Sequence, residues 1–214
     1  MAVSLPLSAP RTDLPRRLAQ LAAGLVLYGV SMGLMLRASL GGNPWDVFHQ
    51  GLARHLGLSV GTWVTVVGAL VLLLWIPLRQ KPGVGTVGNV LVLGVAMDAT
   101  LSLLAPPHAL AVRVPLLAAG IVLNGLASGL YIGARLGPGP RDGLMTGLHR
   151  RTGRSVRLIR TGIELTVLAV GIALGGTFGL GTVAYALAIG PLVQFFLPRL
   201  TVPDSAAPAT ATQV

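Results

Sequence analysis

The sequence predicts an all-α, polytopic membrane protein of about six transmembrane helices, arranged as two inverted three-helix repeats. Three observations predict this class: an internal duplication, a composition rich in apolar residues, and a one-sided distribution of basic residues. Residues 21–94 align without a gap on residues 117–190, an offset of 96, and 31 of these 74 pairs are identical. Such a duplication in a membrane chain is typical of two halves related by a pseudo-twofold axis, with functional elements at their interface.

The composition is that of a chain whose solvent is lipid. Hydrophobic residues make up 53% of the chain and charged residues 10%, and the mean hydropathy is +0.76, whereas an ordinary soluble domain carries roughly 25% charged residues. A helix needs about 20 residues to cross a bilayer, and six apolar stretches approach this length: residues 18–36, 60–78, 86–104, 114–132, 159–174 and 180–197. The fifth contains Arg160 and Glu164 and the third contains Asn89 and Asp98, so a five-span interpretation stays open.

These stretches divide the chain into four parts. Residues 1–17 form an N-terminal tail, residues 18–105 the first membrane repeat, residues 113–199 the second repeat, and residues 200–214 a C-terminal tail. Both tails hold too little apolar surface to order themselves, so we expect disorder there. Because each repeat contributes three spans, an odd number, the second repeat must enter the bilayer in the opposite direction.

The basic residues agree with opposite orientations. With both termini in the cytoplasm, thirteen Lys and Arg residues fall on the inner side and only Arg37, Arg54 and Arg113 fall outside, a strong positive-inside bias. The net charge of +10 is thereby explained by topology, and we expect no nucleic-acid partner because the basic residues are spread over loops between apolar spans. Alternatively, the densest cluster of basic residues binds anionic lipid headgroups. This cluster comprises Arg135, Arg141, Arg150, Arg151 and Arg154.

A duplicated Leu-Gly-x-x-Pro-x-Asp motif, at residues 40–46 and 136–142, is the most specific pattern in the chain. Proline is favoured at the first position of a helix, and the helix dipole favours an acidic residue within the first turn. The motif therefore predicts a short helix beginning at Pro44 and another at Pro140, ending near Gly57 and Gly153. Both are too short to cross the bilayer, so they either lie at its surface or dip into it as half-helices.

The two placements give Asp46 and Asp142 different roles. If the half-helices that begin at Pro44 and Pro140 enter the membrane, irregular backbone there must face protein or a water-filled cavity. The helix N-termini would then attract anions, and the two carboxylates would line one central site and attract cations or protons. If they lie at the surface, each aspartate merely caps its helix. Both alternatives stay open at this stage.

Other polar residues within the spans are further candidates. Asn89, Asp98 and Glu164 lie inside predicted spans, where ionisable groups are functional candidates by default. Glu164 has Arg160 one turn earlier, which predicts a salt bridge, whereas Asp98 has no partner nearby in the sequence. A duplicated Gly-x-Gly-Thr at residues 83–86 and 179–182 predicts a helix start capped by threonine.

No recognisable reaction chemistry accompanies these groups. The four histidines show no ligand spacing, the chain has no cysteine, and no catalytic triad, nucleotide loop or pair of catalytic carboxylates is visible. We therefore expect no metal, no cofactor and no enzymatic activity.

Three segments carry a resemblance to a known family. Residues 41–52, 77–86 and 137–148 resemble the YczE-like integral membrane proteins of bacteria, grouped loosely with the YitT and YyaS proteins. The resemblance covers roughly residues 18–198. It implies a bacterial inner-membrane protein of about six spans and supplies no functional residue.

Two functions follow from different features of the sequence. The duplication, the broken helices and the acidic residues in the spans favour a small secondary transporter or channel for a solute or ion. The lack of a dense polar pathway favours a non-transporting scaffold or regulator of a partner protein. Assembly into a homo-oligomer is compatible with either.

Overall fold

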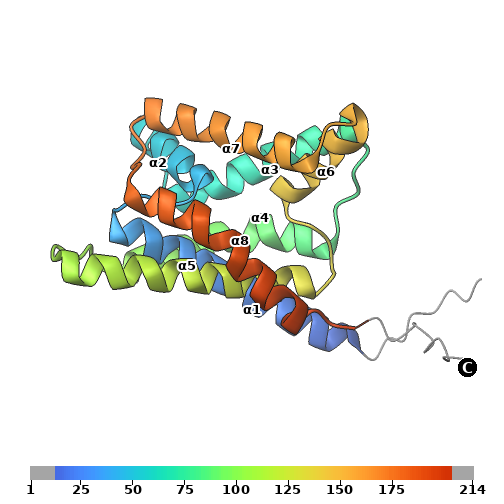
Figure 1. Cartoon of the computed structure of the whole chain (residues 1–214), viewed down its shortest axis with the longest axis horizontal. Coiled ribbons are helices and arrows are strands. Elements are labelled where there is room, and N and C mark those ends of the chain that lie inside the picture. The colour runs from blue at the N-terminus through green and yellow to red at the C-terminus, as the bar shows by residue number, and fades with distance from the viewer. Residues whose placement is uncertain (1–12, 204–214) are drawn as a thin grey trace, which may run out of the picture.

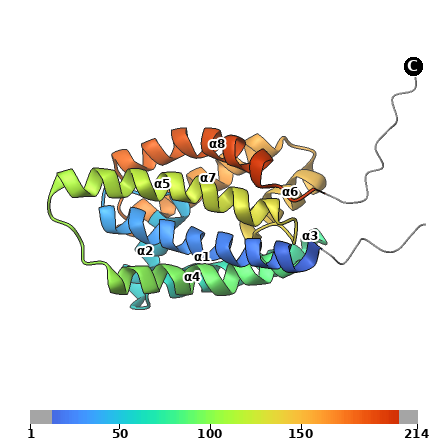
Figure 2. The same cartoon turned by 90° about the horizontal axis from the view of Figure 1, so that it is seen from below.

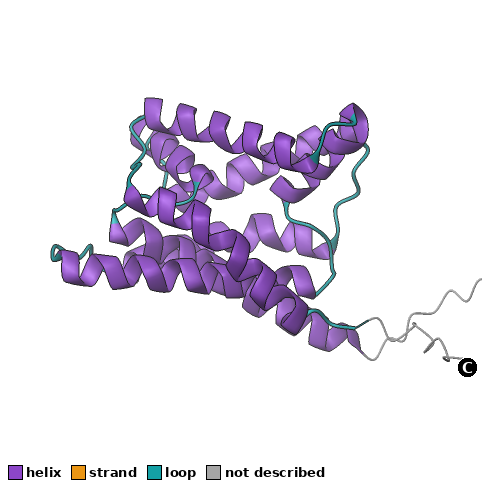
Figure 3. Cartoon of the chain, viewed as in Figure 1, coloured by secondary structure: helices purple, strands orange, loops and turns teal. Residues whose placement is uncertain are grey.

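The computed structural model describes residues 13–203, and within them all regular structure is helical (Figure 3). This confirms the predicted all-α class. Eight helices follow one another along the chain: α1 (Leu14–Ala38), α2 (Pro44–Leu56), α3 (Val60–Leu78), α4 (Val84–Leu103), α5 (Leu110–Gly133), α6 (Pro140–Thr152), α7 (Val156–Ala173) and α8 (Leu180–Leu200).

Five of these helices are long and apolar enough to cross a membrane, namely α1, α3, α4, α5 and α8. The stretch predicted as the fifth span forms α7, but its turns carry Arg157, Arg160 and Glu164, and it is not among the five. The six-span expectation is therefore not confirmed. Helix α1 begins at Leu14, so residues 14–17 are helical rather than part of the predicted tail. Residues 1–12 and 204–214 lie outside the described residues.

The two short helices begin and end where local signals place them. Pro44 and Pro140 occupy their first turns, and each helix ends at a left-handed glycine, Gly57 at φ 74° and Gly153 at φ 69°. Proline presets the helical φ angle and glycine adopts the left-handed region without a steric penalty. The predicted starts and ends of both helices are confirmed.

The long helices form a layer in the order α4, α1, α5, α8 (Figure 2). Glycines bring neighbours close: a Cβ on Gly29 would lie 2.6 Å from the Ala96 Cβ of α4, and one on Gly125 would lie 2.6 Å from the Leu192 Cβ of α8. Small residues at this spacing let helix backbones approach. Helices α2, α3, α6 and α7 cover one face of this layer (Figure 1).

Each short helix begins inside the bundle and runs outward, toward the end of the bundle where the preceding long helix stops (Figure 1). The residues at its start are buried, such as Trp45 in α2 and Pro140 in α6, and the residues at its end are exposed, such as Leu56 and Thr152. The connection between α3 and α4 lies at one end of the bundle and the connection between α7 and α8 at the other.

The two repeats hold one another through their glycine turns. The Gly85 N–H donates to the Leu136 carbonyl oxygen at 2.8 Å, and the Gly181 N–H donates to the Leu40 carbonyl oxygen at 2.7 Å. Residues 85 and 181 are equivalent in the sequence alignment, as are residues 40 and 136. Each loop that precedes a short helix therefore docks on the Gly-x-Gly-Thr turn of the other repeat.

Candidate functional site

The starts of α2 and α6 meet in the middle of the bundle. The guanidinium carbon of Arg141 lies 4.5 Å from the centroid of the Trp45 ring. These residues hold equivalent positions in the two repeats, so the contact joins the same point of both short helices. A guanidinium over an indole face is attracted by the ring quadrupole, by up to about 2 kcal/mol when desolvated.

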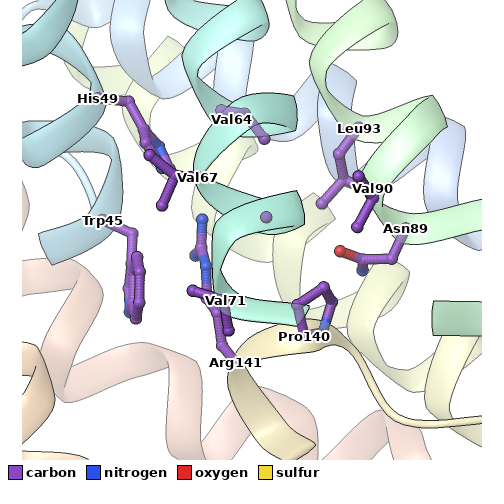
Figure 4. A pocket seen from close by; sticks show the side chains of 11 residues that line it. Trp45, His49, Val64, Val67, Val71, Asn89, Val90, Leu93, Pro140 and Arg141 are labelled. Carbon is purple, nitrogen blue, oxygen red and sulfur yellow. The ribbon is translucent and has the colours of Figure 1, made fainter. Parts of the chain in front are cut away.

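A small cavity adjoins this contact. Its volume is about 20 Å³, which is enough for about one water molecule. Figure 4 shows the side chains of Trp45 and His49 on one side of it and that of Asn89 on the other, with Arg141 between them. Most of the remaining lining is apolar: Val64, Val67, Gly68, Val71, Val90, Leu93 and Pro140.

Arg141 has no hydrogen bond or close ion pair among the described residues, although its charge interacts at longer range with the Asp46 carboxylate. Its side chain is half-buried, and within residues 13–203 it forms neither a hydrogen bond nor an ion pair within 4.0 Å, its contact with the Trp45 ring aside. Charged groups inside a membrane protein are costly and are found paired or facing a water-filled cavity. The guanidinium is therefore available to a group that the chain itself does not supply.

His49 is the second polar group at this cavity with unused capacity. It is fully buried, and neither ring nitrogen has a hydrogen-bond partner within the described part of the chain. Its nearest carboxylate oxygen is Asp46 Oδ1, 3.9 Å from Nδ1, which is too far for a hydrogen bond. Buried polar atoms are normally satisfied, so such an orphan calls for an explanation.

Asp46 does not cap its helix. The cap of α2 is Asn43, whose Oδ1 accepts from the Asp46 backbone N–H at 3.0 Å, and whose side-chain amide donates to Asp46 Oδ2. The other oxygen, Oδ1, is buried without a hydrogen-bond partner among the described residues. The expectation that Asp46 caps its helix at the surface is wrong, because Asn43 is the cap and Asp46 is only 2% exposed.

Asp142 has different surroundings from its counterpart. Its Oδ2 accepts from the Tyr131 hydroxyl at 2.6 Å, and α6 begins at Gly139 without any side-chain cap. The residue also lines an open pocket of about 400 Å³ together with Ile132, Arg135, Gly137 and Pro138. The enclosed cavity is lined by neither aspartate. The structure thus brings the two motifs together but gives their carboxylates separate environments.

A hydrogen-bonded chain crosses the α1–α5–α8 interface nearby. The Tyr185 hydroxyl donates to Asn124 Oδ1 at 3.1 Å, and Asn124 Nδ2 donates to Ser31 Oγ at 2.8 Å. Asn89, which lines the cavity, is the sequence equivalent of Tyr185, and Tyr28 is the equivalent of Asn124. One Asn–Tyr pair is therefore locked in the second repeat, while in the first repeat the asparagine faces the cavity.

The remaining predicted residues lie away from this centre. Asp98 accepts from the Gly61 backbone N–H at 2.9 Å and from Ser59, so α3 supplies the partner that was missing in the sequence. Glu164 accepts from Arg160 at 2.8 Å, which confirms the predicted salt bridge. Both contacts are structural.

The predicted threonine cap is present in only one of the two described Gly-x-Gly-Thr turns. Thr86 Oγ1 accepts from the Gly83 N–H at 3.1 Å and donates to the Pro138 carbonyl oxygen at 2.7 Å, which confirms the cap. The equivalent Thr182 hydroxyl is buried and has no hydrogen-bond partner among the described residues.

The basic cluster is also divided by the fold. Arg135, Arg150, Arg151 and Arg154 are exposed, whereas Arg141 turns inward onto the Trp45 ring. Arg141 therefore does not lie with the exposed residues of the lipid-facing cluster in which the sequence placed it.

Sequence reasoning missed His49, Tyr131 and the direct contact between Trp45 and Arg141. One local signal was present for His49, which lies three residues after Asp46 and hence on the same face of α2. The other two depend on contacts between segments far apart in the chain. Within the described residues, no cluster of three or more His, Asp or Glu side chains is placed to hold a metal ion.

Comparisons with known proteins agree with the membrane character of the fold. The profile of a family of unknown function, DUF6198, matches residues 15–198. The chain is 40% identical over 173 residues to an uncharacterized protein of Haemophilus influenzae, covering 81% of this chain and 79% of the relative. It is 37% identical over 180 residues to the uncharacterized membrane protein YczE of Bacillus subtilis, covering 83% of each.

A more distant relative is the uncharacterized protein YyaS of Bacillus subtilis, 25% identical over 179 residues, or 82% of this chain and 89% of YyaS. No solved structure matches the chain.

Proposed function

The chain belongs to DUF6198, a family of unknown function, and we propose that it is a small secondary transporter whose substrate passes between α2 and α6. The contact between Trp45 and Arg141 carries this proposal. Transporters built from repeats bind substrate where discontinuous helices from the two repeats meet, because the free helix ends there supply polar groups.

We infer that the two halves have inverted topology, with six helices crossing the bilayer. Equivalent connections lie at opposite ends of the bundle (Figure 1), and the reciprocal Leu40–Gly181 and Leu136–Gly85 hydrogen bonds relate the repeats symmetrically. In this arrangement α7 is the sixth span, although its turns carry Arg157, Arg160 and Glu164. Both termini are cytoplasmic, and the membrane is the bacterial inner membrane.

A difference between the repeats supports alternating access. Helix α3 packs closely on α4, where a Cβ on Gly94 would lie 2.2 Å from the Gly61 carbonyl oxygen, while the equivalent Gly190 of α8 has nothing within 4 Å. Helix α7 packs on α2 and α6 and has no comparable packing against α8 within the described residues. The first repeat is thus closed in this conformation and the second is loose, with Asp142 lining an open pocket.

The exposed arginines at the end of α6 suit anionic lipid headgroups. Arg150, Arg151 and Arg154 gather where α6 meets α7, beside an open apolar pocket of about 500 Å³ that Arg154 helps to line. Acidic lipids are attracted to such clusters on the cytoplasmic side.

A membrane scaffold or regulator is the second candidate. The observation in its favour is the small size of the cavity between Trp45, His49, Asn89 and Arg141, about 20 Å³, which is the room of about one water molecule. In a scaffold the central contact would only hold the two repeats together, and no solute would cross.

Reconstituted vesicles distinguish the two candidates. Osmotic swelling, followed by light scattering, reports entry of the potassium salts of chloride, nitrate and formate when valinomycin carries K⁺ across the bilayer. The sodium and potassium salts without valinomycin report transport that includes the cation, and glycerol is the neutral solute. A transporter accelerates swelling for at least one salt over protein-free vesicles. A scaffold leaves the rates of all solutes unchanged, and that outcome would overturn the proposal.

Charge removal at the motif tests the site itself. We expect Asp46→Asn and Asp142→Asn each to slow swelling while purification yield stays unchanged, because the amide keeps the shape and removes the charge. Asp98→Asn is the matched control, since Asp98 lies on α4, bonds the Gly61 N–H at the start of α3 and does not line the cavity. Equal rates for all three variants and the parent would contradict a role for the motif.

A further inference from the structure

We infer that the cavity between Trp45, His49, Asn89 and Arg141 binds a small monovalent anion. This inference rests on the proposed transport function, and the anion is the substrate class of that function. The unpaired guanidinium is the first reason. The Arg141 guanidinium has five N–H donors, forms no hydrogen bond within residues 13–203, and lies against the Trp45 ring. An anion would supply the acceptors that these donors lack.

The donors around the cavity match an anion. A neutral imidazole offers one N–H, and both nitrogens of the fully buried His49 are unpartnered within the described chain. Figure 4 shows the His49 side chain and the Asn89 amide extending toward the cavity from opposite sides, with the Arg141 guanidinium between them and Trp45 alongside. An imidazole N–H, an amide NH₂ and a guanidinium would thus converge on one bound group.

The start of α6 adds a favourable field. Helix N-termini carry partial positive charge and free N–H groups. The N-cap residue of α6 is Gly139, which has no side chain to satisfy those N–H groups, whereas the equivalent end of α2 is capped by Asn43. The uncapped end therefore belongs to the same short helix that supplies Arg141.

The two carboxylates do not make this a cation site. Asp142 accepts from Tyr131 and lines the open pocket instead, and Asp46 Oδ2 accepts from the Asn43 amide. Neither lines the enclosed cavity. Their negative charge nearby limits the ligand to one charge, because a divalent anion would face one guanidinium and two carboxylates.

Cavity size sets the upper limit on the ligand. A volume of about 20 Å³ is the room of about one water molecule, so a single-atom anion such as chloride fits best, and formate or nitrate would require the lining to move apart. Chloride, nitrate and formate are therefore the probes.

Binding is measured on the full-length protein in detergent by titration calorimetry, in a gluconate buffer free of chloride. We expect saturable binding of at least one of the three probes to the parent protein. Arg141→Gln should weaken binding by about tenfold or more, since hydrogen bonds to charged groups contribute about 1.5–3 kcal/mol. Arg150→Gln is the matched control, because Arg150 is exposed at the far end of α6, and its affinity should equal that of the parent.

Asn89→Asp provides a second test in case Arg141→Gln does not fold. The substitution keeps the shape and places a negative charge on the cavity wall, so anion binding should be lost while the thermal unfolding temperature changes little. Absence of saturable binding by the parent, or equal affinity in the parent and a folded Asn89→Asp variant, would overturn the inference.

Flux separates this inference from the proposed function. Vesicles could swell in a sodium or potassium salt regardless of which of the three anions is present, while the parent protein binds none of them. That result would support transport and refute the anion site. If the parent binds an anion but no solute crosses the vesicle membrane, the anion site is confirmed as a fixed structural site. The proposed transport function, and the anion's role as its substrate, are then refuted.

Discussion

Trp75 fixes the position of the short helix that carries Arg141. Its Nε1 donates to the Pro140 carbonyl oxygen at 3.0 Å, and the indole covers Gly143, where an added Cβ would lie 2.0 Å from ring atom Cζ2. In the other repeat the sizes are exchanged, since Gly171 of α7 takes the place of Trp75 and contacts the backbone of Val47. A large side chain on α3 and a glycine on α7 thus support equivalent helices in different ways.

This contact yields a prediction for Gly143→Ala. The methyl group would overlap the Trp75 ring, a rigid group that is 2% exposed and has little room to move. Overpacking of this kind costs about 1–3 kcal/mol, so we expect a lower unfolding temperature in detergent and weaker anion binding through displacement of Arg141.

Gly162→Ala is the matched control for that substitution. Gly162 also lies within a helix, but an added Cβ would meet nothing within 4 Å, and alanine is the better helix former by about 1 kcal/mol. We expect its unfolding temperature to be unchanged or raised. If Gly143→Ala proves as stable as Gly162→Ala, the Trp75 contact does not hold α6 in place.

Among the elements, α3 and α7 differ most although they are sequence equivalents. Helix α3 approaches α4 through Gly61, Gly68 and Gly94. The corresponding residues are Arg157, Glu164 and Gly190, and the two charged side chains keep α7 from packing on α8 in the same manner. The looseness of α7 therefore has a local cause in the residues that replaced glycine.

Engineered disulfides test this difference, because the chain has no cysteine of its own. A Cβ on Gly68 would lie 3.9 Å from the Val90 Cβ, within the range that a disulfide needs. We expect the pair Gly68→Cys with Val90→Cys to oxidise readily in detergent, as seen by a mobility shift on a non-reducing gel. The equivalent pair, Glu164→Cys with Ala186→Cys, should oxidise far more slowly.

Single-cysteine variants control for bonds between two molecules. Equal oxidation rates for the two pairs would show that α7 packs on α8 as closely as α3 packs on α4, and would remove the asymmetry on which alternating access is argued. A rate for the second pair that rises when a transported salt is added would instead report closure of α7.

At the scale of the whole molecule, the ends of the bundle determine the topology. The connection between α3 and α4 and the tip between α6 and α7 lie at one end, while the connections between α4 and α5 and between α7 and α8 lie at the other (Figure 1). Arg79, Lys81, Arg150, Arg151 and Arg154 all belong to the first end, so it is the end that the positive-inside bias assigns to the cytoplasm.

Cysteine labelling in intact cells tests this orientation. Pro82→Cys and Arg150→Cys should be protected from a membrane-impermeant maleimide, whereas His108→Cys and Phe178→Cys should be labelled. Positions 82 and 178 are equivalent in the repeats, and all four side chains are exposed. Labelling of positions 82 and 178 from the same side would refute inverted repeats. Gly176 is unsuitable for this purpose, because a Cβ there would lie 2.0 Å from the Val47 carbonyl oxygen.

The sequence by itself determined the helical membrane class and the starts and ends of the short helices. These properties depend on local causes: the length of an apolar run, proline in a first turn, and glycine in the left-handed region at Gly57 and Gly153. The status of α7 was less certain for the same reason, because Arg160 and Glu164 interrupt its apolar pattern.

Only the tertiary structure decided what the short helices surround. The duplication aligned Trp45 with Arg141 but could not indicate that they touch, since equivalent residues meet only if they lie close to the axis between the repeats. The surroundings of Asp46, His49 and Asp142 likewise depend on partners from other segments, such as Tyr131 for Asp142. Side-chain burial and pairing are set by packing between distant parts of the chain, whereas the signals in a single sequence act over a few residues.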